Sequence, residues 1–385
     1  MRILFLINSL CAGGAEVFVT DLAVAFTQKH HKVALFAYAG VLDEKGRSLQ
    51  QQLAAADVQV MLSSARTTME KAATTLQVIR LFKTFRPDVV HSHLEQSDLL
   101  GFLAALAWWP RRRPRFVRTL HSIYATKRLP VFFHECLSTF FDMNVACGPR
   151  VAREYPYLNK SRLDVIENGI RIPASTSSCH ATNLRRTLGI ADSAFLLVNV
   201  GSFFVRDGQL PKAQDVMIDA LEQVHRTDIH LLFIGDGDCR EAMEVRVRKQ
   251  GLSGHIHFVG LVASPSTYLQ VADAVIMPSR FEGLSIACIE AACLGKPLIL
   301  SNIDAFAPFR GPSAVEVVPN DAHSLADGII IALRALPAMQ KAALARKDEF
   351  SKVFDIDAVA DRYLRVYHGH AHDHAARISH SGDTA

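Results

Sequence analysis

The sequence has no run of apolar residues long enough to cross a bilayer. Its nearest approach, residues 99–109, has 11 residues, whereas a membrane-spanning helix needs about 20. The N-terminus also lacks the pattern of a secretory signal, because the short apolar stretch 3–7 is followed at once by polar Asn8. We therefore expect a cytoplasmic protein, with any membrane contact peripheral and on the inner face of the cytoplasmic membrane.

The sequence has few cysteines and a small net charge. The 7 cysteines are an odd number and form no C-x-x-C pair, which favours a reduced compartment and gives no zinc or redox site. The 42 Lys+Arg nearly balance the 38 Asp+Glu, and no basic stripe interleaves with aromatic residues. We predict no metal site and no nucleic-acid partner.

Short apolar runs typical of buried strands alternate with segments of helical period. The first are a strand pattern at 3–7, a helix pattern at 15–30 and a strand pattern at 33–37. The rhythm stops in the Gly-, Pro- and Ser-rich segment 168–178 and restarts at 195–200. Such alternation is typical of βαβ units on parallel sheets, so the sequence predicts an α/β protein with two halves of similar size. Because ligands bind beyond the carboxyl ends of parallel strands, we expect the site in the cleft between these halves.

The last part of the chain differs from the rest. Within residues 355–367, Val359, Tyr363 and Val366 have the spacing of one helix face. Residues 369–385 show no apolar period and are predicted to be a mobile tail. Its alternating histidines are metal-ligand types, but a solvated tail is the better interpretation because nothing nearby would fix a coordination geometry.

The strongest local pattern lies at 277–297. It predicts a strand, a loop that carries Glu282, and a helix from about Leu284 that Gly295 stops. Glu290 is expected about two turns inside this helix, on an otherwise apolar segment. A helix carboxylate paired with a lysine is the structural alternative for Glu290.

Between the two carboxylates lie the backbone amides of Gly283, Leu284 and Ser285. Uncapped amides at a helix N-terminus attract phosphate. One carboxylate for sugar hydroxyls, one for a ribose and these amides for a diphosphate would form a nucleotide-sugar site.

Two glycine turns add to this pattern. Gly13 and Gly14 would let the backbone approach a ligand just before the predicted helix 15–30, with a bare tight turn as the alternative. Gly235 opens a G-x-G turn, but Arg240 stands where a dinucleotide fingerprint needs its third glycine. We interpret this turn as a strand-to-helix connection near a nucleotide base.

Glu282 and Glu290, in the setting F-E-G-L-S-x-x-x-x-E-A-x-x-x-G-K-P, resemble the E-x7-E signature of retaining glycosyltransferases with the GT-B fold, specifically family 4. The resemblance runs in order from residue 1 to about residue 370 and includes segments 7–16, 86–93 and 118–121. It implies two Rossmann-like parallel-sheet domains that face each other across a cleft. These are an acceptor-binding domain, 1–170, and a nucleotide-sugar-binding domain, 171–354, with a helix at 355–368 that returns to the first domain.

The resemblance also implies roles for individual residues. The family places an arginine after the glycine that ends the first strand of the nucleotide domain, and a lysine about five residues later. Here Gly201 is followed by Ser202, and Lys212 follows an insertion, 205–211, in which Arg206 is expected to replace the missing arginine.

Two histidines end strands of the first domain. His121 is expected to hydrogen-bond the donor sugar or its reacting centre, although a lone histidine at a strand end is more often structural. His93 is similarly placed and is expected to shape the acceptor side.

The function implied is a retaining, metal-independent hexosyltransferase without a cofactor. It would move a sugar from a UDP- or GDP-type donor to a hydroxyl of a glycan or lipid-linked acceptor, in cell-surface polysaccharide or lipopolysaccharide synthesis. A nucleotide-sugar epimerase or hydrolase of the same fold is one alternative, and a non-catalytic scaffold, suggested by Ser202, is another. The Trp- and Arg-rich run from Trp108 to Arg115 is typical of contact with an anionic membrane surface, with a solvated loop as the alternative.

Overall fold

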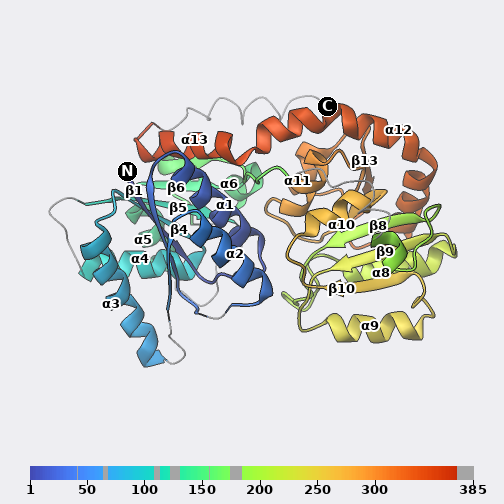
Figure 1. The fold of residues 1–385 in the computed structure, drawn as a ribbon, viewed down its shortest axis with the longest axis horizontal. Coiled ribbons are helices and arrows are strands. Elements are labelled where there is room, and N and C mark those ends of the chain that lie inside the picture. The colour runs from blue at the N-terminus through green and yellow to red at the C-terminus, as the bar shows by residue number, and fades with distance from the viewer. Residues whose placement is uncertain are drawn as a thin grey trace. The chain divides into compact units, whose positions relative to one another are not determined.

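A computed structural model describes residues 1–40, 42–63, 68–107, 113–121, 131–155, 157–173 and 184–370. The chain divides into two compact units, Met1–Ile170 with Phe354–Ala385, and Arg171–Val353. Figure 1 shows each unit as a sheet covered by helices. Trp108 to Arg112 and the tail beyond residue 370, to which the sequence analysis assigned a membrane contact and mobility, lie outside the described residues.

The first unit is built on a seven-stranded parallel sheet in the order β3-β2-β1-β4-β5-β6-β7. Its strands are β1 (Arg2–Ile7), β2 (Lys32–Ala37), β3 (Gln59–Leu62), β4 (Val89–His93), β5 (Arg115–Leu120), β6 (Met143–Ala146) and β7 (Leu163–Val165). Its helices are α1 (Gly14–Gln28), α2 (Glu44–Ala55), α3 (Thr68–Phe85), α4 (Glu95–Ala107), α5 (Val131–Phe140), α6 (Pro149–Glu154), the short 3₁₀ helix η1 (Lys160–Arg162) and α13 (Ile356–Tyr367). The strand order reverses between β1 and β4, where a ligand site is expected.

Side-chain alternation along β1 explains the layers of this unit. Ile3, Phe5 and Ile7 pack against α1, α2 and α13 on one face. Leu4 and Leu6 pack against α3, α4 and α5 on the other. Because both faces are buried, the strand is apolar from Ile3 to Ile7, as is typical of parallel sheets.

The second unit has a six-stranded parallel sheet in the order β10-β9-β8-β11-β12-β13. Its strands are β8 (Phe195–Val200), β9 (Ile229–Ile234), β10 (Ile256–Gly260), β11 (Ala274–Met277), β12 (Leu298–Ser301) and β13 (Ala314–Val317). Its helices are α8 (Gln214–Val224), α9 (Arg240–Lys249), α10 (Pro265–Val271), α11 (Ile286–Cys293), η2 (Asp304–Phe309) and α12 (Ala322–Phe354). Phe195 and Leu197 of β8 pack with α8 and α12 in its core.

Helix α12 is, among the described residues, the one helix long and apolar enough to cross a membrane by length and composition. A single helix of this kind is weak evidence of a membrane span, because core helices of soluble proteins pass the same test of length and composition. Leu325, Ile329 and Ala332 of α12 are buried in the core of the second unit. Core packing therefore accounts for part of its apolar composition.

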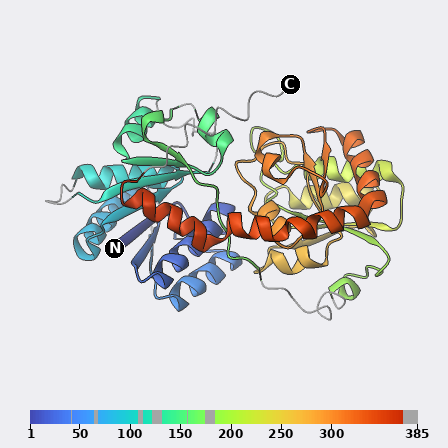
Figure 2. The ribbon, with the colours of Figure 1, turned by 90° about the horizontal axis from the view of Figure 1, so that it is seen from above.

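Helix α13 completes the first unit from the far end of the sequence (Figure 2). Val359, Tyr363 and Val366 are buried on the sheet beside α1. At its start, the backbone N–H of Ile170 donates to the carbonyl of Phe354 (2.8 Å), and the N–H of Ile356 donates to the carbonyl of Ile170 (3.0 Å). The end of the unit's first segment is thereby hydrogen-bonded to the start of its second segment.

A buried polar network ties α4 to the sheet of the first unit. Arg118 of β5 is 1% exposed, and its Nη1 lies 3.6 Å from Oδ2 of Asp98 in α4. Ser92 of β4 donates to the other carboxylate oxygen of Asp98, and Arg118 Nε donates to Oδ1 of Asn144 in β6 (2.6 Å). Burial raises the pKa of Asp98 to about 6, although the charge of Arg118 opposes this shift.

This shift sets a testable dependence of stability on pH. Because the pKa of Asp98 is about 6 in the folded protein and 3.8 ordinarily, its stabilising contribution is complete below pH 3.8 and is lost as pH rises through 6. Relative to Asp98→Asn, the wild type should lose about 2 kcal/mol of unfolding free energy between pH 4 and pH 7. Urea unfolding of both proteins across this range measures the difference.

Asp228 provides the control, because its exposed pair with Arg226 (2.6 Å) lowers its pKa. For Asp228→Asn the difference should be small and of opposite sign, since a lowered pKa favours the folded wild type as pH rises. Equal slopes for the two variants would show that Asp98 does not titrate as its burial requires.

Candidate functional site

Three glycines line the carboxyl ends of the strands in the second unit. Gly201 follows β8, and Gly235 and Gly237 follow β9. Gly235 has φ of +140°, and a Cβ added there would lie 2.0 Å from the carbonyl oxygen of Gly201. Only glycine fits where these two backbone segments approach so closely. The turn at Gly235 therefore connects β9 to α9, as the sequence predicted, and leaves the backbone bare at this edge.

Lys212 and Glu282 meet above this edge. The Lys212 Nζ forms an ion pair with Oε1 of Glu282, and these side chains are 21% and 10% exposed. A Cβ on Gly201 would lie 2.7 Å from Cγ of Lys212, so the lysine stem lies directly on this glycine. The Oγ of Ser279 also donates to Oε1 of Glu282 (3.3 Å). The structure thus brings together three of the residues that the sequence singled out.

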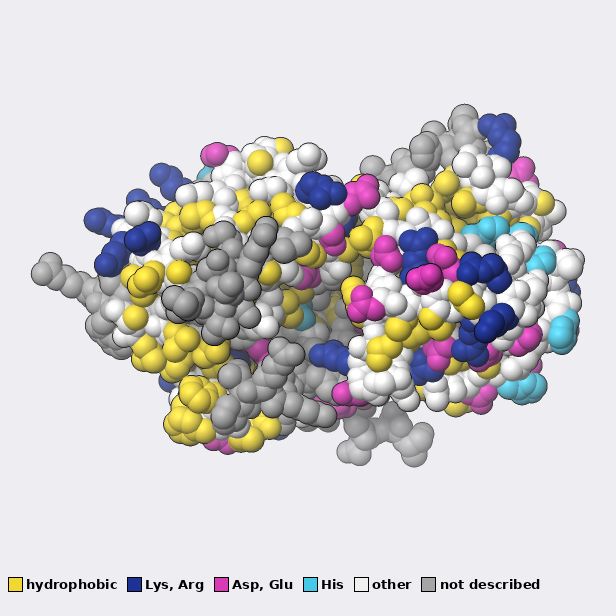
Figure 3. Space-filling view, turned by 90° about the horizontal axis from the view of Figure 1, so that it is seen from below, with side chains coloured by type: hydrophobic (Ala, Val, Ile, Leu, Met, Phe, Trp, Pro, Cys, Tyr) yellow, Lys and Arg dark blue, Asp and Glu magenta, His cyan; other side chains and the backbone are white. Residues whose placement is uncertain are grey.

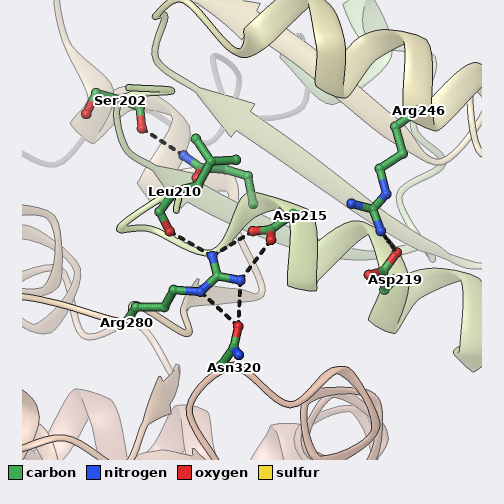
Figure 4. A network of polar contacts seen from close by, with 8 residues as sticks. Ser202, Leu210, Asp215, Asp219, Arg246, Arg280 and Asn320 are labelled. Atoms are coloured by element: carbon green, nitrogen blue, oxygen red, sulfur yellow. Dashed lines mark hydrogen bonds and ion pairs between the residues drawn. The ribbon is translucent and has the colours of Figure 1, made fainter. Parts of the chain in front are cut away.

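Arg280 holds the two segments that carry this pair (Figure 4). Its Nη1 and Nη2 each donate to the carboxylate of Asp215 at 2.8 Å, and Nη1 donates to the carbonyl of Leu210 at 2.8 Å. Its Nε and Nη2 donate to Oδ1 of Asn320 at 2.8 and 2.6 Å, and its backbone N–H donates to the carbonyl of Pro211 at 2.8 Å. The loop before α11 is thereby fixed against the segment before α8.

Asp215 is the anionic partner of this clamp. Burial raises its pKa, but the hydrogen bonds and charge of Arg280 outweigh burial and hold the pKa below the ordinary value. Asp215 therefore stays ionised at neutral pH and occupies both terminal nitrogens of Arg280 in a bidentate pair. Arg280 and Asp215 are structural residues of the site that the sequence analysis missed. The available signal was an arginine two positions before Glu282, in the loop that follows β11.

Helix α11 begins two residues later than expected. Ser285 is its N-cap, and its hydroxyl accepts from the backbone N–H of Cys288 (3.4 Å). Gly283, Leu284 and Ser285 therefore precede the helix, and the free amides of its first turn begin at Ile286. The boundary shifts because a serine hydroxyl that caps the chain favours the N-cap position over the helix interior.

Glu290 is correspondingly the fifth residue of α11, little more than one turn from its start. It is partly buried, whereas Ile289 and Ala291 beside it are fully buried. The expected depth of two turns was wrong, because the predicted helix start was too early.

The insertion between Gly201 and Lys212 contains a tight turn. The backbone groups of Arg206 and Gln209 exchange hydrogen bonds of 2.8 and 3.0 Å, and Asp207 and Gly208 between them have φ of +51° and +79°. These angles are typical of a type I′ turn. Arg206 is exposed at the base of this turn.

Ser202 occupies the position at which the related enzymes are expected to have arginine. Its side chain is exposed, and its carbonyl accepts from Nε2 of buried Gln214 (3.0 Å; Figure 4). The contact fixes the backbone after Gly201 to the start of α8. It supplies no positive charge.

In the first unit, Gly13 is the N-cap of α1 and Gly14 its first residue. A Cβ on Gly13 would lie 2.1 Å from Oε2 of Glu16, so the Glu16 carboxylate folds back over the helix start. Ser9 donates to its Oε1 (3.2 Å), and burial raises the pKa of Glu16. The carboxylate of Glu16 therefore lies against Gly13, where the sequence predicted the close approach of a ligand to the backbone.

His121 follows β5 and contacts a second histidine. Its Nε2 lies 3.0 Å from Nδ1 of His93 at the end of β4, and burial lowers the pKa of His121 to about 4. Within the part of the chain that the structure describes, no group of three or more His, Cys, Asp or Glu side chains is arranged to hold a metal ion.

Comparison with known proteins identifies the family. Residues 194–335 match the family model "Glycosyl transferases group 1", and residues 12–172 match "Glycosyltransferase Family 4". The chain is 22% identical over 382 residues to the O-antigen biosynthesis glycosyltransferase WclY of Escherichia coli, with 95% of this chain and 98% of that protein covered. It is 26% identical over 366 residues to the lipopolysaccharide core biosynthesis glycosyltransferase LpsD of Rhizobium meliloti, with 92% and 95% covered.

The fold agrees with these matches. The crystal structure of Anabaena Alr3699/HepE in complex with UDP-glucose superimposes with a TM-score of 0.81 and 19% identity, covering 96% of this chain and 100% of that one. Two Rossmann-like parallel-sheet units of this kind form the GT-B fold. With both halves matched by glycosyltransferase models and relatives aligned along almost the whole chain, this protein belongs to the group 1 glycosyl transferases.

Proposed function

We propose that this glycosyltransferase moves a sugar from a nucleoside diphosphate to a hydroxyl of a glycan or lipid-linked acceptor, with retention of the anomeric configuration. The observation that carries the proposal is the Lys212–Glu282 ion pair above Gly201. A cation, a carboxylate and bare glycine backbone at one sheet edge suit a ligand that has both phosphate and hydroxyl groups. Lys212 would pair with the diphosphate on binding, which releases Glu282 to accept from sugar hydroxyls.

The remaining roles are those that the resemblance to the family implies. The first amides of α11 and the exposed guanidinium of Arg206 would add positive potential for the diphosphate. Glu290 would accept from the ribose hydroxyls, and Gly235 would admit the base. His121 would hydrogen-bond the donor sugar.

The chemistry proposed needs no added cofactor. The bond between the anomeric carbon and the phosphate oxygen breaks, and the acceptor oxygen bonds to the same face of that carbon. The acceptor's proton passes to the leaving phosphate. Lys212 and the amides of α11 would stabilise the charge that develops on this phosphate, and preorganised donors are commonly worth about 2.7–4 kcal/mol each.

The relatives support a donor and an acceptor class. HepE was crystallised with UDP and with UDP-glucose, which favours UDP over GDP as the carrier here. WclY and LpsD are named for O-antigen and lipopolysaccharide core biosynthesis, which favours an acceptor in cell-surface polysaccharide or lipopolysaccharide synthesis. Such acceptors suit a cytoplasmic enzyme that works at the inner membrane face.

A membrane contact through Trp108 to Arg115 is part of the proposal. Leu103 and Leu106, in the last turn of α4 just before this run, are 40% and 58% exposed. Figure 3 shows hydrophobic side chains gathered in several places on one face of the first unit. Arg113, however, donates to Asp142 (3.1 Å) and to the carbonyl of Phe140 (3.0 Å). Arg113 is therefore engaged in contacts within the first unit. The proposed membrane contact rests on the sequence from Trp108 to Arg112.

Substitutions at the donor site should separate its two ends. Lys212→Ala is expected to weaken both UDP and pyrophosphate by about tenfold or more, because one charge-assisted contact to the diphosphate is lost. Glu290→Gln should weaken UDP but leave pyrophosphate unchanged, because only UDP has a ribose. Titration calorimetry measures both affinities. Lys249→Ala and Glu241→Gln, both exposed on α9, are the controls, and equal losses for all four variants would contradict the assignment.

Analysis of the products tests the reaction. With UDP-sugar and a lipopolysaccharide-type acceptor, proton NMR should show a new glycoside with the anomeric configuration of the donor. Incubation with UDP-sugar alone should leave the donor largely intact. Epimerised sugar or rapid release of free sugar without acceptor would favour the epimerase or hydrolase alternative. Nucleotide binding without transfer to any acceptor would favour the scaffold.

Vesicle binding tests the membrane contact. Arg111→Gln combined with Arg112→Gln should weaken binding to vesicles of anionic phospholipid, measured by co-sedimentation. The binding free energy should fall by about 2 kcal/mol, at about 1 kcal/mol for each cation removed. Binding to neutral phosphatidylcholine vesicles should be weak for both proteins. Arg226→Gln combined with Lys249→Gln, exposed positions of the second unit, is the control. The proposal fails where this control weakens binding as much.

A further inference from the structure

Three histidines, His91, His93 and His121, form a layer at the carboxyl edge of the first unit's sheet. His91 and His93 of β4 and Thr119 of β5 share the sheet face that α13 covers, and all three are fully buried. The ring centroids of His91 and His93 lie 4.1 Å apart, and those of His93 and His121 lie 5.3 Å apart and stack. His93 is therefore held between two other histidine rings.

His91 has a hydrogen-bond partner at each ring nitrogen. Its Nδ1 lies 2.6 Å from the hydroxyl of Tyr367, and its Nε2 lies 2.8 Å from Oγ1 of Thr119. Thr119 Oγ1 also lies 2.9 Å from the hydroxyl of Tyr363. These contacts fix the plane of the His91 ring, against which the His93 ring packs.

His93 has a partner at one nitrogen only. Its Nδ1 lies 3.0 Å from Nε2 of His121, whereas its own Nε2 is buried without a partner among the described residues. Phe18 presents its ring edge-on to both His93 and His121, at centroid distances of 6.1 and 5.9 Å. The geometry allows one hydrogen bond between the two histidines, in one of two directions.

Burial selects the neutral form of both rings. It lowers the pKa of His121 to about 4 and the pKa of His93 well below the ordinary value. Each ring then carries one proton, so one ring donates and the other accepts. If His121 donated, the proton of His93 would lie on buried Nε2 as an orphan N–H, which native proteins avoid more strictly than an unpaired acceptor.

We propose that His93 is a positioning residue that donates from Nδ1 to Nε2 of His121, and thereby holds the proton of His121 on Nδ1. This inference rests on the proposed role of His121. It deepens that role, because His121 then offers the sugar nucleotide a hydrogen-bond donor aimed at an oxygen lone pair. It does not act as a base at that nitrogen.

The experiment uses two nearly isosteric replacements in the full chain. His93→Leu removes the donor, whereas His93→Asn keeps an amide N–H close to the position of Nδ1. Long-range ¹H–¹⁵N spectra of protein labelled at histidine report which nitrogen of His121 carries the proton, and His121→Gln assigns its signals by difference. Steady-state kinetics report kcat and KM for the donor.

In the wild type and His93→Asn, the proton of His121 should lie on Nδ1. In His93→Leu it should redistribute toward Nε2, and kcat/KM for the donor should fall about tenfold, the loss expected of one hydrogen bond. His93→Asn should recover most of this loss. Loss of packing alone would affect both variants and leave the tautomer of His121 unchanged.

The outcomes separate this inference from the function that it rests on. A wild-type proton on Nε2 of His121, or equal activity in His93→Leu and His93→Asn, overturns the inference about His93. Full transfer activity in His121→Gln instead overturns the role of His121 in the proposed function. The spectra still decide the direction of the His93 hydrogen bond in that case.

Discussion

The proposed donor site depends on one bidentate ion pair. Arg280 lies two residues before Glu282, and Asp215 lies three residues after Lys212, so the Arg280–Asp215 pair fixes the spacing of the segments that carry Lys212 and Glu282. The backbone bond from Arg280 to Pro211 adds a second point of attachment. Without this clamp, Lys212 and Glu282 would lie on two independent loops. A rigid spacing between them needs the planar fork of arginine, which lysine could not reproduce.

The clamp also bears on the missing arginine after Gly201. With Ser202 at that position, the arginine that the resemblance implies is absent from the end of β8, and Arg280 does not replace it because its donors are engaged by Asp215, Asn320 and Leu210. In the proposed donor site, the positive charge for the diphosphate would therefore come from Lys212 and the amides of α11, with Arg206 on the insertion. The donor site of this chain concentrates its charge in fewer groups than the resemblance implied.

Most of the strands could be predicted from the sequence, because buried parallel strands such as β1 and β8 are apolar at all but one position and are bounded by polar turns. Strands β3 and β13 were missed. Both are four-residue edge strands: β3 has only three apolar residues after Gln59, and Glu316 interrupts β13. The start of α11 was misplaced because a capping serine and an interior serine look alike without coordinates. The clamp by Arg280 and the covering of the α1 N-terminus by Glu16 depend on side-chain directions, which periodicity does not carry.

The first unit is discontinuous in the chain, since the core that begins with Ile3, Phe5 and Ile7 is completed only by Val359, Tyr363 and Val366. The second unit is encoded entirely between these two parts. During synthesis, the ribosome therefore releases all of the second unit before the last helix of the first is available. The first unit would wait with one face of its sheet incompletely covered while the second folds. In the order of folding, the unit that comes second in the sequence is able to finish first.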